Sequence, residues 1–385
     1  MADVLSYLKS KYAGLAGNVE TIAQLALQKQ IHQLSVEIVR FLDIAVSSGV
    51  SGEELVDFFN NFVGQYSSKM SPSILVAILA KCVSCSDVAG SVGLGLLEKH
   101  ASQISKSTDA SVLGKVLSAE IYLRKMKDLG EARTVIDSVV DSFEDPIYAL
   151  SVKGSVRGSL HLVASELYLT LGNDLEFYKH LVKFLVYTPV AEISAETLAL
   201  KTKQAAVIAL VHPEINDFGE LLSLQAFSGS SAWIVDFLRS IHFGDFAAFE
   251  ASLKNHAGEL AKESELMSKI DTSLRRKLTM IALAELAGFH TNEKNRRLSF
   301  DQISKHCRVS VSEVEELVMT AMGAGGLVQG IIDEVDSTVV ITAVKPRVLD
   351  VDRLVILKTR IESWANRADQ LVNKLTEMTP ELIVS

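Results

Sequence analysis

Apolar residues recur three and four positions apart from the start of the chain to about residue 290, with short polar breaks between the runs. One face of an α-helix returns every 3.6 residues, so this spacing predicts a succession of amphipathic helices. The same part shows no convincing alternation of apolar and polar residues, which a half-buried strand would require. We therefore predict a mainly α protein whose chain is helical up to residue 290.

Three short segments share one local pattern, in which a glycine follows an amphipathic helix and opens the next one. The glycines are Gly130, Gly172 and Gly244, with intervals of 42 and 72 residues. Intervals of this size are typical of stacked helix-turn-helix repeats, in which glycine permits the tight turn. We therefore predict a TPR-like helical-repeat solenoid, with N-terminal repeats over residues 1–173 and a further helical part over residues 174–296.

Residues 297–348 combine two short helical patterns with two strand patterns. Ser299 with Gln302, and Ser310 with Glu313, have the spacing of capping boxes at helix starts. The apolar stretches LVQGIIDEV and TVVITAV then predict a hairpin, joined by a turn near Asp336–Ser337. Two capped helices followed by a hairpin are the layout of a winged helix-turn-helix.

Most small modules of this shape bind DNA, but the charges here argue against that function. From Val309 to Val344 the sequence has no lysine, arginine or histidine, and it has six acidic residues. Such a surface repels phosphates, so no release of counterions would drive binding. We predict instead a protein-docking module whose wing edge, including Val340 and Thr342, pairs with a neighbouring sheet. The simpler alternative is a packing module with a solvated acidic helix.

Residues 349–385 contain a long heptad pattern, which predicts a C-terminal bundle helix. A helix from Val351 to Met378 would be about 42 Å long. Its narrow apolar seam suits a bundle with helices of other chains, and the alternative is a helix folded back on its own domain. The predicted interface positions are Leu354, Leu357, Ile361, Trp364, Ala368, Leu371, Leu375 and Met378.

Composition and charge bound the class of protein. The sequence is 48% hydrophobic and 22% charged, with a formal net charge of −9, which indicates a soluble folded protein and weakly disfavours nucleic acid or an anionic membrane as partner. The N-terminus lacks the pattern of a secretory signal, and the densest apolar run, Ile74–Ala80, is too short to span a bilayer. Three cysteines suggest a reducing compartment, so we expect a cytoplasmic and nuclear protein.

Several motifs resemble chemical sites, but their contexts favour structural roles. Cys82 and Cys85 form a CxxC that continues an apolar helix, and the remaining cysteine, Cys307, is distant, so we predict a buried pair rather than a zinc or redox site. The glycine-rich run Gly90–Lys99 lacks the Gly-Lys-Ser/Thr ending of a phosphate loop. His242 and His212 lie among apolar residues, without HxH or HExxH spacing, so we predict satisfied core or turn histidines rather than ligands. We therefore expect no catalysis, no cofactor, no metal and no small-molecule substrate.

Two basic clusters precede or border the predicted winged helix. The first is Arg275–Lys277, and the second combines Lys294 with Arg296 and Arg297. Such clusters usually form solvated faces. On an acidic chain, salt bridges to an acidic neighbouring subunit are a second interpretation, and contact with nucleic acid is a third.

Helical repeats that run into a winged helix and end in one long helix resemble the PCI-domain family. That family supplies scaffold subunits of the proteasome lid, the COP9 signalosome and translation initiation factor three. The likeness is specific from Asp174 to the end of the chain and looser over Gln28–Asp43, and within it the motifs are most similar to lid proteins. The motifs are NDFGELL (Asn216–Leu222), AWIVDFLRSIHFGDFAAF (Ala232–Phe249), LSFDQIS (Leu298–Ser304), VEELVMTAM (Val314–Met322), GLVQGIIDEVDSTVVITAVKPRVLD (Gly326–Asp350) and LKTRIESW (Leu357–Trp364).

The resemblance implies a non-catalytic scaffold subunit of the 26S proteasome regulatory particle lid, acting in ubiquitin-dependent protein degradation. Residues 174–296 would then be the helical part of a PCI domain. The winged helix would share sheet edges with other PCI-type lid subunits, and the C-terminal helix would enter a multi-subunit bundle. The alternatives are a PCI subunit of the COP9 signalosome or of initiation factor three, and a winged-helix nucleic-acid-binding protein.

Overall fold

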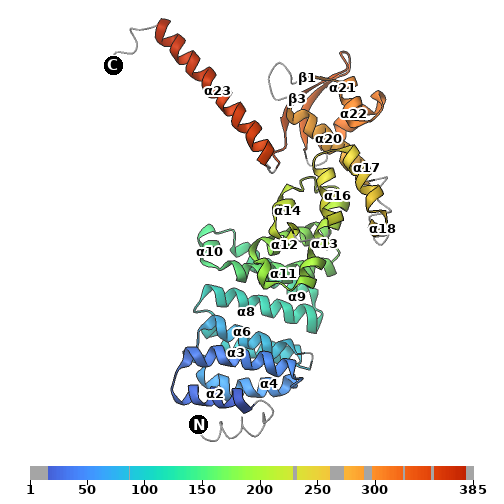
Figure 1. The fold of residues 1–385 in the computed structure, drawn as a ribbon. Helices are drawn as coiled ribbons and strands as arrows, with labels where there is room; N and C mark the ends of the chain where they lie inside the picture. The colour runs from blue at the N-terminus through green and yellow to red at the C-terminus, as the bar shows by residue number, and fades with distance from the viewer. Residues whose placement is uncertain are drawn as a thin grey trace. The chain divides into compact units, whose positions relative to one another are not determined.

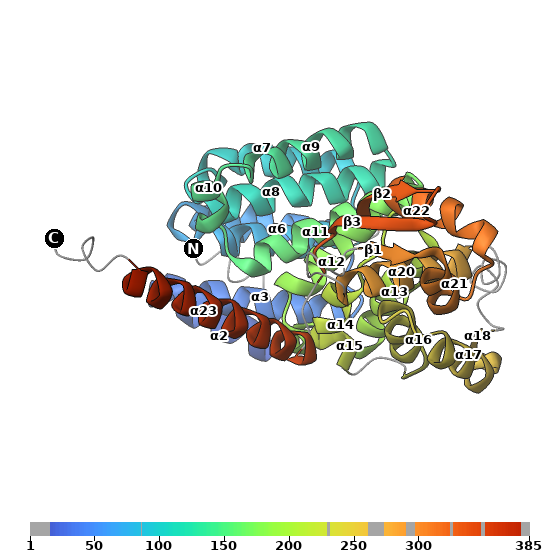
Figure 2. The same cartoon turned by 90° about the horizontal axis from the view of Figure 1, so that it is seen from above.

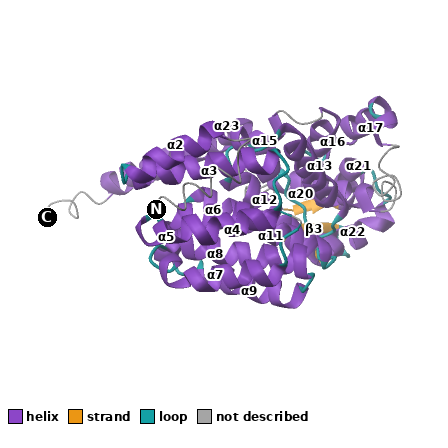
Figure 3. Cartoon of the chain, turned by 90° about the horizontal axis from the view of Figure 1, so that it is seen from below, coloured by secondary structure: helices purple, strands orange, loops and turns teal. Residues whose placement is uncertain are grey.

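The computed structural model describes residues 16–85, 87–228, 232–260, 273–289, 297–323, 326–347 and 351–378. These residues fall into two compact units, Met1–Ser194 and Ala195–Ser385. Helices make up most of both units, and the strands that the structure describes form one small sheet (Figure 3). The predicted fold class, helical repeats followed by a winged helix and a long C-terminal helix, is confirmed.

The first unit is a stack of helices laid one on another in the order of the sequence (Figure 1). Short π-helical turns over Phe59–Val63 and Tyr122–Met126 interrupt the α-helical pattern. The helices are α2 (Ala16–Leu27), α3 (Ile31–Ser47), α4 (Gly52–Phe58), α5 (Gly64–Tyr66), α6 (Pro72–Ser84), α7 (Gly90–Ile104), α8 (Thr108–Ile121), α9 (Leu129–Ser142), α10 (Pro146–Ser151), α11 (Gly154–Thr170) and α12 (Asp174–Tyr187).

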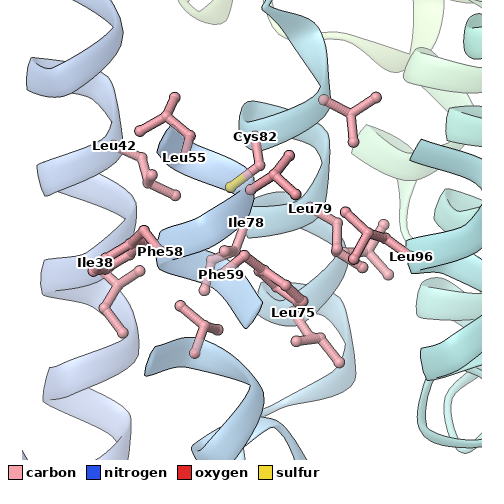
Figure 4. Packing of buried hydrophobic residues seen from close by; sticks show 14 of the residues in the cluster. Ile38, Leu42, Leu55, Phe58, Phe59, Leu75, Ile78, Leu79, Cys82 and Leu96 are labelled. Carbon is pink, nitrogen blue, oxygen red and sulfur yellow. The ribbon is translucent and has the colours of Figure 1, made fainter. Parts of the chain in front are cut away.

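The N-terminal core forms because each helix turns its apolar stripe toward its neighbours. On α3 the stripe includes Ile38, Phe41 and Leu42, all with no more than 1% of their surface exposed. The ring of Phe41 lies 5.3 Å from that of Phe58 on α4. Cys82 on α6 lies in the same cluster (Figure 4), so this thiol serves as core packing. Burying each large apolar side chain stabilises the fold by about 1.5–3 kcal/mol.

Two of the three predicted turn glycines have the expected left-handed backbone, whereas the third does not. Gly172 has φ +71° and Gly244 has φ +67°. Gly130 instead lies inside the first turn of α9, where Asp128 accepts hydrogen bonds from the backbone N–H groups of Gly130 and Glu131. Lys127, with φ 55°, makes that turn in place of glycine. Because Asp128 caps α9, the helix already begins at Leu129, and the left-handed turn lies before Gly130 rather than at it.

The second unit begins with helices and continues into the winged helix (Figures 1 and 2). Its helices before the sheet are α13 (Ala195–Val211), α14 (Gly219–Ser223), α15 (Gln225–Ser228), α16 (Ala232–His242), α17 (Phe246–Asn255), α18 (Ala257–Leu260) and α20 (Arg275–Phe289). The winged helix and tail comprise β1 (Arg297–Ser299), α21 (Phe300–Cys307), a 3₁₀ turn (Val311–Glu313), α22 (Val314–Gly323), β2 (Val328–Asp333), β3 (Thr338–Val344) and α23 (Val351–Met378).

Both predicted capping boxes of the winged helix are confirmed. The Ser299 hydroxyl accepts from the Gln302 N–H at 3.2 Å, and the Gln302 side chain accepts from the Ser299 N–H at 3.1 Å. Ser310 and Glu313 repeat the arrangement before α22. These local hydrogen bonds satisfy backbone donors that a helix start leaves free, which fixes where the two helices begin.

The glycine at the turn between α16 and α17 predicts a measurable difference in stability. A Cβ at Gly244 would lie 2.8 Å from the Ala282 Cα on α20, whereas nothing lies within 4 Å of a Cβ at Gly172. Both positions have positive φ, so Gly172→Ala should cost about 1–2 kcal/mol from backbone strain alone. Gly244→Ala should cost at least about 1 kcal/mol more, because α20 must also move. Urea unfolding of the two variants checks this, and equal losses would contradict the close approach.

Candidate interaction surfaces

Strand β3 lies in the middle of the sheet, so the predicted position of Val340 at an open edge is wrong. The order is β1-β3-β2, and both pairings are antiparallel. Val340 has Arg297 as its register partner on one side and Ile331 on the other. The physical reason is β1, a three-residue strand that the sequence pattern does not indicate. Its three residues pair with Thr338–Val340, so this first part of β3 lies between two strands.

Thr342 is the extra residue of a β-bulge. Gln329 pairs with Ala343 and Gly330 with Ile341, so Thr342 has no counterpart on β2. The two strands approach closely beside the bulge, since a Cβ at Gly330 would lie 2.6 Å from the carbonyl oxygen of Val340. Within the described residues β2 pairs on one side, with β3. In the part of the chain that the structure describes, the free edges of this sheet are therefore β1, β2 and the end of β3 beyond Val340, where Thr342 lies.

The outward face of the sheet presents apolar side chains to solvent. Val339 and Ile341 point into the core of the winged helix, and the alternate residues Val340 and Thr342 point away from it. Ile331, opposite Val340, is 64% exposed, and Val335 in the hairpin turn is 96% exposed. We call Ile331, Val335, Val340 and Thr342 the wing surface. The sequence could have indicated this surface, because Ile331 and Ile332 are adjacent in a strand and their side chains must therefore lie on opposite faces of the sheet.

Helix α22 packs as the sequence predicts and carries acidic residues on its outer side. Val314, Leu317, Val318 and Ala321 are buried. The Ser310 hydroxyl and backbone N–H lower the pKa of Glu313, so this exposed carboxylate stays ionised. Glu316, also exposed, lies 3.4 Å from Arg276 of α20. The face that a DNA-binding winged helix would place in the major groove is therefore negatively charged.

In the first basic cluster Lys277 is buried, which rules out a solvated face for that residue, whereas Arg276 is 57% exposed and pairs with Glu316 of its own chain. Lys277 is 2% exposed, and its Nζ donates to the carbonyl oxygens of Ala209 at 2.7 Å and His212 at 2.8 Å. Arg276 contacts α22. In the second cluster Arg297 lies 3.2 Å from Asp336, whereas Lys294 and Arg296 are outside the described residues.

Lys277 acts as a cap for the C-terminal end of α13. Burial lowers the pKa of its ammonium group to about 7. The free carbonyl groups at a helix end and the ring of Phe218, 5.1 Å from Nζ, favour the charged form. The ammonium group thereby ties α20 to the helix that opens the second unit.

A second buried cation, Arg347, fixes the chain where it leaves the sheet. Its side chain is 8% exposed and pairs with Glu285 of α20. It also donates to the carbonyl oxygen of His242 at 2.7 Å and contacts Nδ1 of that histidine at 2.9 Å. His242 is 3% exposed, so the prediction of a satisfied core histidine is confirmed. The segment that leads to α23 therefore starts from a rigid point, which the sequence pattern did not indicate.

Helix α23 has the predicted bounds, Val351–Met378, and its heptad positions are exposed. The exposed fraction is 55% for Ile361 and 69% for Trp364, although both are large apolar side chains. The structure therefore presents the seam to solvent. The other seam residues, Leu354, Leu357, Ala368, Leu371, Leu375 and Met378, are exposed as well.

The motifs that resembled chemical sites have structural roles. Burial raises the pKa of the Cys82 and Cys307 thiols to about 12, which disfavours reactive thiolates. Gly90–Lys99 lies in α7 rather than in a phosphate-binding loop. The His212 carbonyl accepts from Lys277, as described above. Among the described residues, no group of three or more His, Cys, Asp or Glu side chains could hold a metal ion. None of the described helices is long and apolar enough to cross a membrane.

Comparison with known proteins agrees with this architecture. Residues 253–343, which include α20, the winged helix and its sheet, match the PCI domain. Residues 18–238 match the family of PSD13 N-terminal repeats, and the chain belongs to this family. The PCI match begins at residue 253, later than the start at 174 that the resemblance implied.

Similar proteins cover almost the whole chain. The 26S proteasome non-ATPase regulatory subunit 13 of Dictyostelium discoideum is 25% identical over 387 residues, which cover 99% of this chain and 98% of that protein. The probable 26S proteasome regulatory subunit rpn9 of Schizosaccharomyces pombe is 27% identical, with 82% and 81% covered. The eukaryotic translation initiation factor 3 subunit M of Phaeosphaeria nodorum is 27% identical over 54% of this chain and 46% of that protein.

Replacing Arg347 should lower the free energy of unfolding of the second unit, because the Glu285 carboxylate would lose this partner. Arg347→Met should cost about 3–5 kcal/mol, because Glu285 would keep a buried charge without this partner. The combined variant R347M/E285L should recover a large part of that loss, since an apolar pair of similar volume avoids the desolvation cost. Urea unfolding of the single and double variants measures both effects. A double variant as unstable as the single one would show that the ion pair is not the source.

Proposed function

We propose that this protein is a non-catalytic scaffold subunit of the 26S proteasome regulatory particle lid, acting in ubiquitin-dependent protein degradation. The observation that carries the proposal is the seam of α23, a long row of apolar side chains that the structure exposes. Monomeric proteins rarely expose contiguous apolar surfaces of this kind unless a partner covers them. Proteins named as proteasome regulatory subunits align with nearly the whole chain, which supports this assembly over others.

Each part of the chain has a separate mechanical task in this proposal. The helical repeats form an arm whose shape is set by stacked apolar cores. The wing surface makes lateral contacts with adjacent PCI-type subunits, and the free edge of β2 is available for pairing with a neighbouring strand. Helix α23 enters a bundle with helices of other subunits, where each covered large side chain stabilises the complex by about 1.5–3 kcal/mol before ordering costs.

We propose no catalytic role for this chain. Its two fully buried thiols have raised pKa values, and His242 is engaged by Arg347. These groups therefore stabilise the fold and are not available to act on a substrate. We further propose that the protein works in the cytoplasm and the nucleus, as expected for a proteasome component.

The main rival is a PCI subunit of another large assembly. A subunit of translation initiation factor 3 has measurable similarity, but the alignment covers about half of each chain. Purification of the endogenous protein with its complex distinguishes the two, because co-purifying proteasome subunits support the proposal and initiation-factor or signalosome subunits contradict it. Salt-dependent binding to DNA at physiological ionic strength would favour the nucleic-acid rival, which the acids around α22 oppose.

Disrupting the seam should block assembly without unfolding the protein. Ile361→Asp combined with Trp364→Ala removes two exposed apolar groups and adds a charge to the seam. The isolated variant should keep the wild-type unfolding midpoint, because neither side chain is buried in the free chain. Its incorporation into the purified regulatory particle should fall at least about tenfold. Wild-type incorporation would contradict the bundle role of α23.

The wing surface gives an independent test of lateral contact. Ile331→Glu should weaken binding to one adjacent subunit by about tenfold, because it places a carboxylate in an interface that excludes water. Met319→Glu on α22 is the matched control, since Met319 is 52% exposed but lies outside the wing surface. Pairwise binding of purified subunits measures both variants. Equal effects, or no effect of either, would count against lateral contact through this surface.

A further inference from the structure

The two borders of the α23 seam differ in charge. Arg360, Arg367 and Lys374 follow one another at intervals of seven residues, so they occupy one position of the heptad and line one border. The opposite border contains Lys358 and is otherwise apolar, with Ala365 and Val372. The apolar face of the helix therefore extends to Ala365 and Val372 on one side and ends at a row of cations on the other. We call Arg360, Arg367 and Lys374 the basic stripe.

The basic stripe has no acidic partner among the residues that the structure describes. All three side chains are exposed, and the Nε of Arg367 donates to a backbone carbonyl of its own helix, that of Ser363. Lys358 on the opposite border differs, because it lies 3.8 Å from Glu362. The remaining acids of the helix, Asp352, Asp369 and Glu377, occupy heptad positions outside both borders. The charge of the stripe is thus available to a partner.

A second copy of this helix is a poor partner for the stripe. In an antiparallel pair the border positions would meet their own equivalents, so Arg360, Arg367 and Lys374 would face cations. In a parallel pair the stripe would face the opposite border, which offers Lys358 or an apolar residue. Like charges across a helix interface are destabilising, and neither arrangement supplies a carboxylate. Like charges therefore disfavour antiparallel self-association through this seam, and parallel self-association leaves the stripe without a carboxylate partner.

Anionic lipids and nucleic acids also match the helix poorly as a whole. Residues 351–378 contain five basic and four acidic residues, so the segment is nearly neutral. Binding to an anionic surface by a helix requires a polar face that is predominantly basic. The local asymmetry instead suits an interface in which one narrow border meets acids and the seam meets apolar residues.

We infer that α23 docks beside a helix of a different chain, whose own apolar seam is bordered by Asp or Glu on the side that faces the basic stripe. The inference rests on the proposed function, in which α23 enters a bundle, and specifies in addition that the partner helix carries acidic residues. The apolar seam supplies the affinity, whereas the stripe selects an acidic partner helix and fixes which side of α23 it occupies. The apolar border with Ala365 and Val372 then contacts a second, uncharged helix surface.

A charge-matched pair of variants tests the role of the stripe in the full-length protein. R360Q/R367Q/K374Q removes three positive charges from the border. T359E/N366E/N373E adds three negative charges at the same intervals on the face opposite the seam, so the net charge of both variants changes equally. The glutamine variant should enter the regulatory particle about tenfold less than wild type, and the control should enter normally. The deficit should shrink at high salt, which screens the lost attraction.

The partner helix is identified by a photo-crosslinking residue placed at position 360 in the assembled particle. The crosslinked peptide should come from a different chain, in a helix with Asp or Glu beside its apolar seam. Reversing those acids to lysine should reduce incorporation, and combining that change with R360E/R367E/K374E should restore it. Rescue by the reversed pair is a result that a purely structural role for the three residues would not produce.

Each outcome separates this inference from the proposed function. If the glutamine variant assembles like wild type while I361D/W364A does not, the stripe inference is overturned and the bundle role stands. If both variants assemble normally, the bundle role itself is overturned. A purified full-length chain that dimerises through the seam would assign a second copy as the occupant and overturn the acidic partner. Stripe-dependent binding to anionic vesicles or to DNA would do the same.

Discussion

Two buried charges on α20 hold the winged helix and the preceding helices in one arrangement. Lys277 near its start caps α13, and Glu285, two turns later, receives Arg347 from the end of the sheet. The free energy of removing these charges from water is recovered when the partners meet with good geometry. Leu278 is fully buried, and Leu283 belongs to the core of the winged helix. Helix α20 is therefore surrounded by protein and can neither rotate nor slide without leaving a charge unpaired.

The interaction surfaces inherit their placement from this constraint. Arg347 holds the segment after β3 against Glu285 and His242. The wing surface is fixed as well, because β3 is central and the core of Val339 and Ile341 sets which residues face outward. The two surfaces differ in size and in kind. In the proposed function, the seam with its eight heptad positions supplies most of the affinity, and the small apolar sheet face adds a lateral contact.

Sequence patterns predicted the features that local chemistry controls. Both capping boxes and the bounds of α23 came from residues within a few positions of one another, and the structure has them as expected. Strand β1 was missed because three residues are too short to show alternation, and its register with β3 spans about forty positions of sequence.

The buried cations were missed for a related reason. A run of arginine and lysine normally indicates a solvated surface, and nothing near Lys277 in the sequence reveals the carbonyl groups of α13. Arg347 and its partner His242 are 105 residues apart. Pairings over such separations depend on the packing of whole helices, which a single sequence does not display. Val340 and Thr342 were predicted at a pairing edge, and the pairing of Val340 with β1 depends on a strand that the sequence pattern does not show.

The basic stripe of α23 also has a consequence for newly made chains that have not yet met their partners. An exposed apolar helix of this length would normally promote aggregation, because the seams of two copies can cover one another. In antiparallel stacking the rows of like charge would face each other, so free copies repel one another in that arrangement. The same three side chains thus reduce aggregation of the unassembled subunit, and they take no part in its buried core.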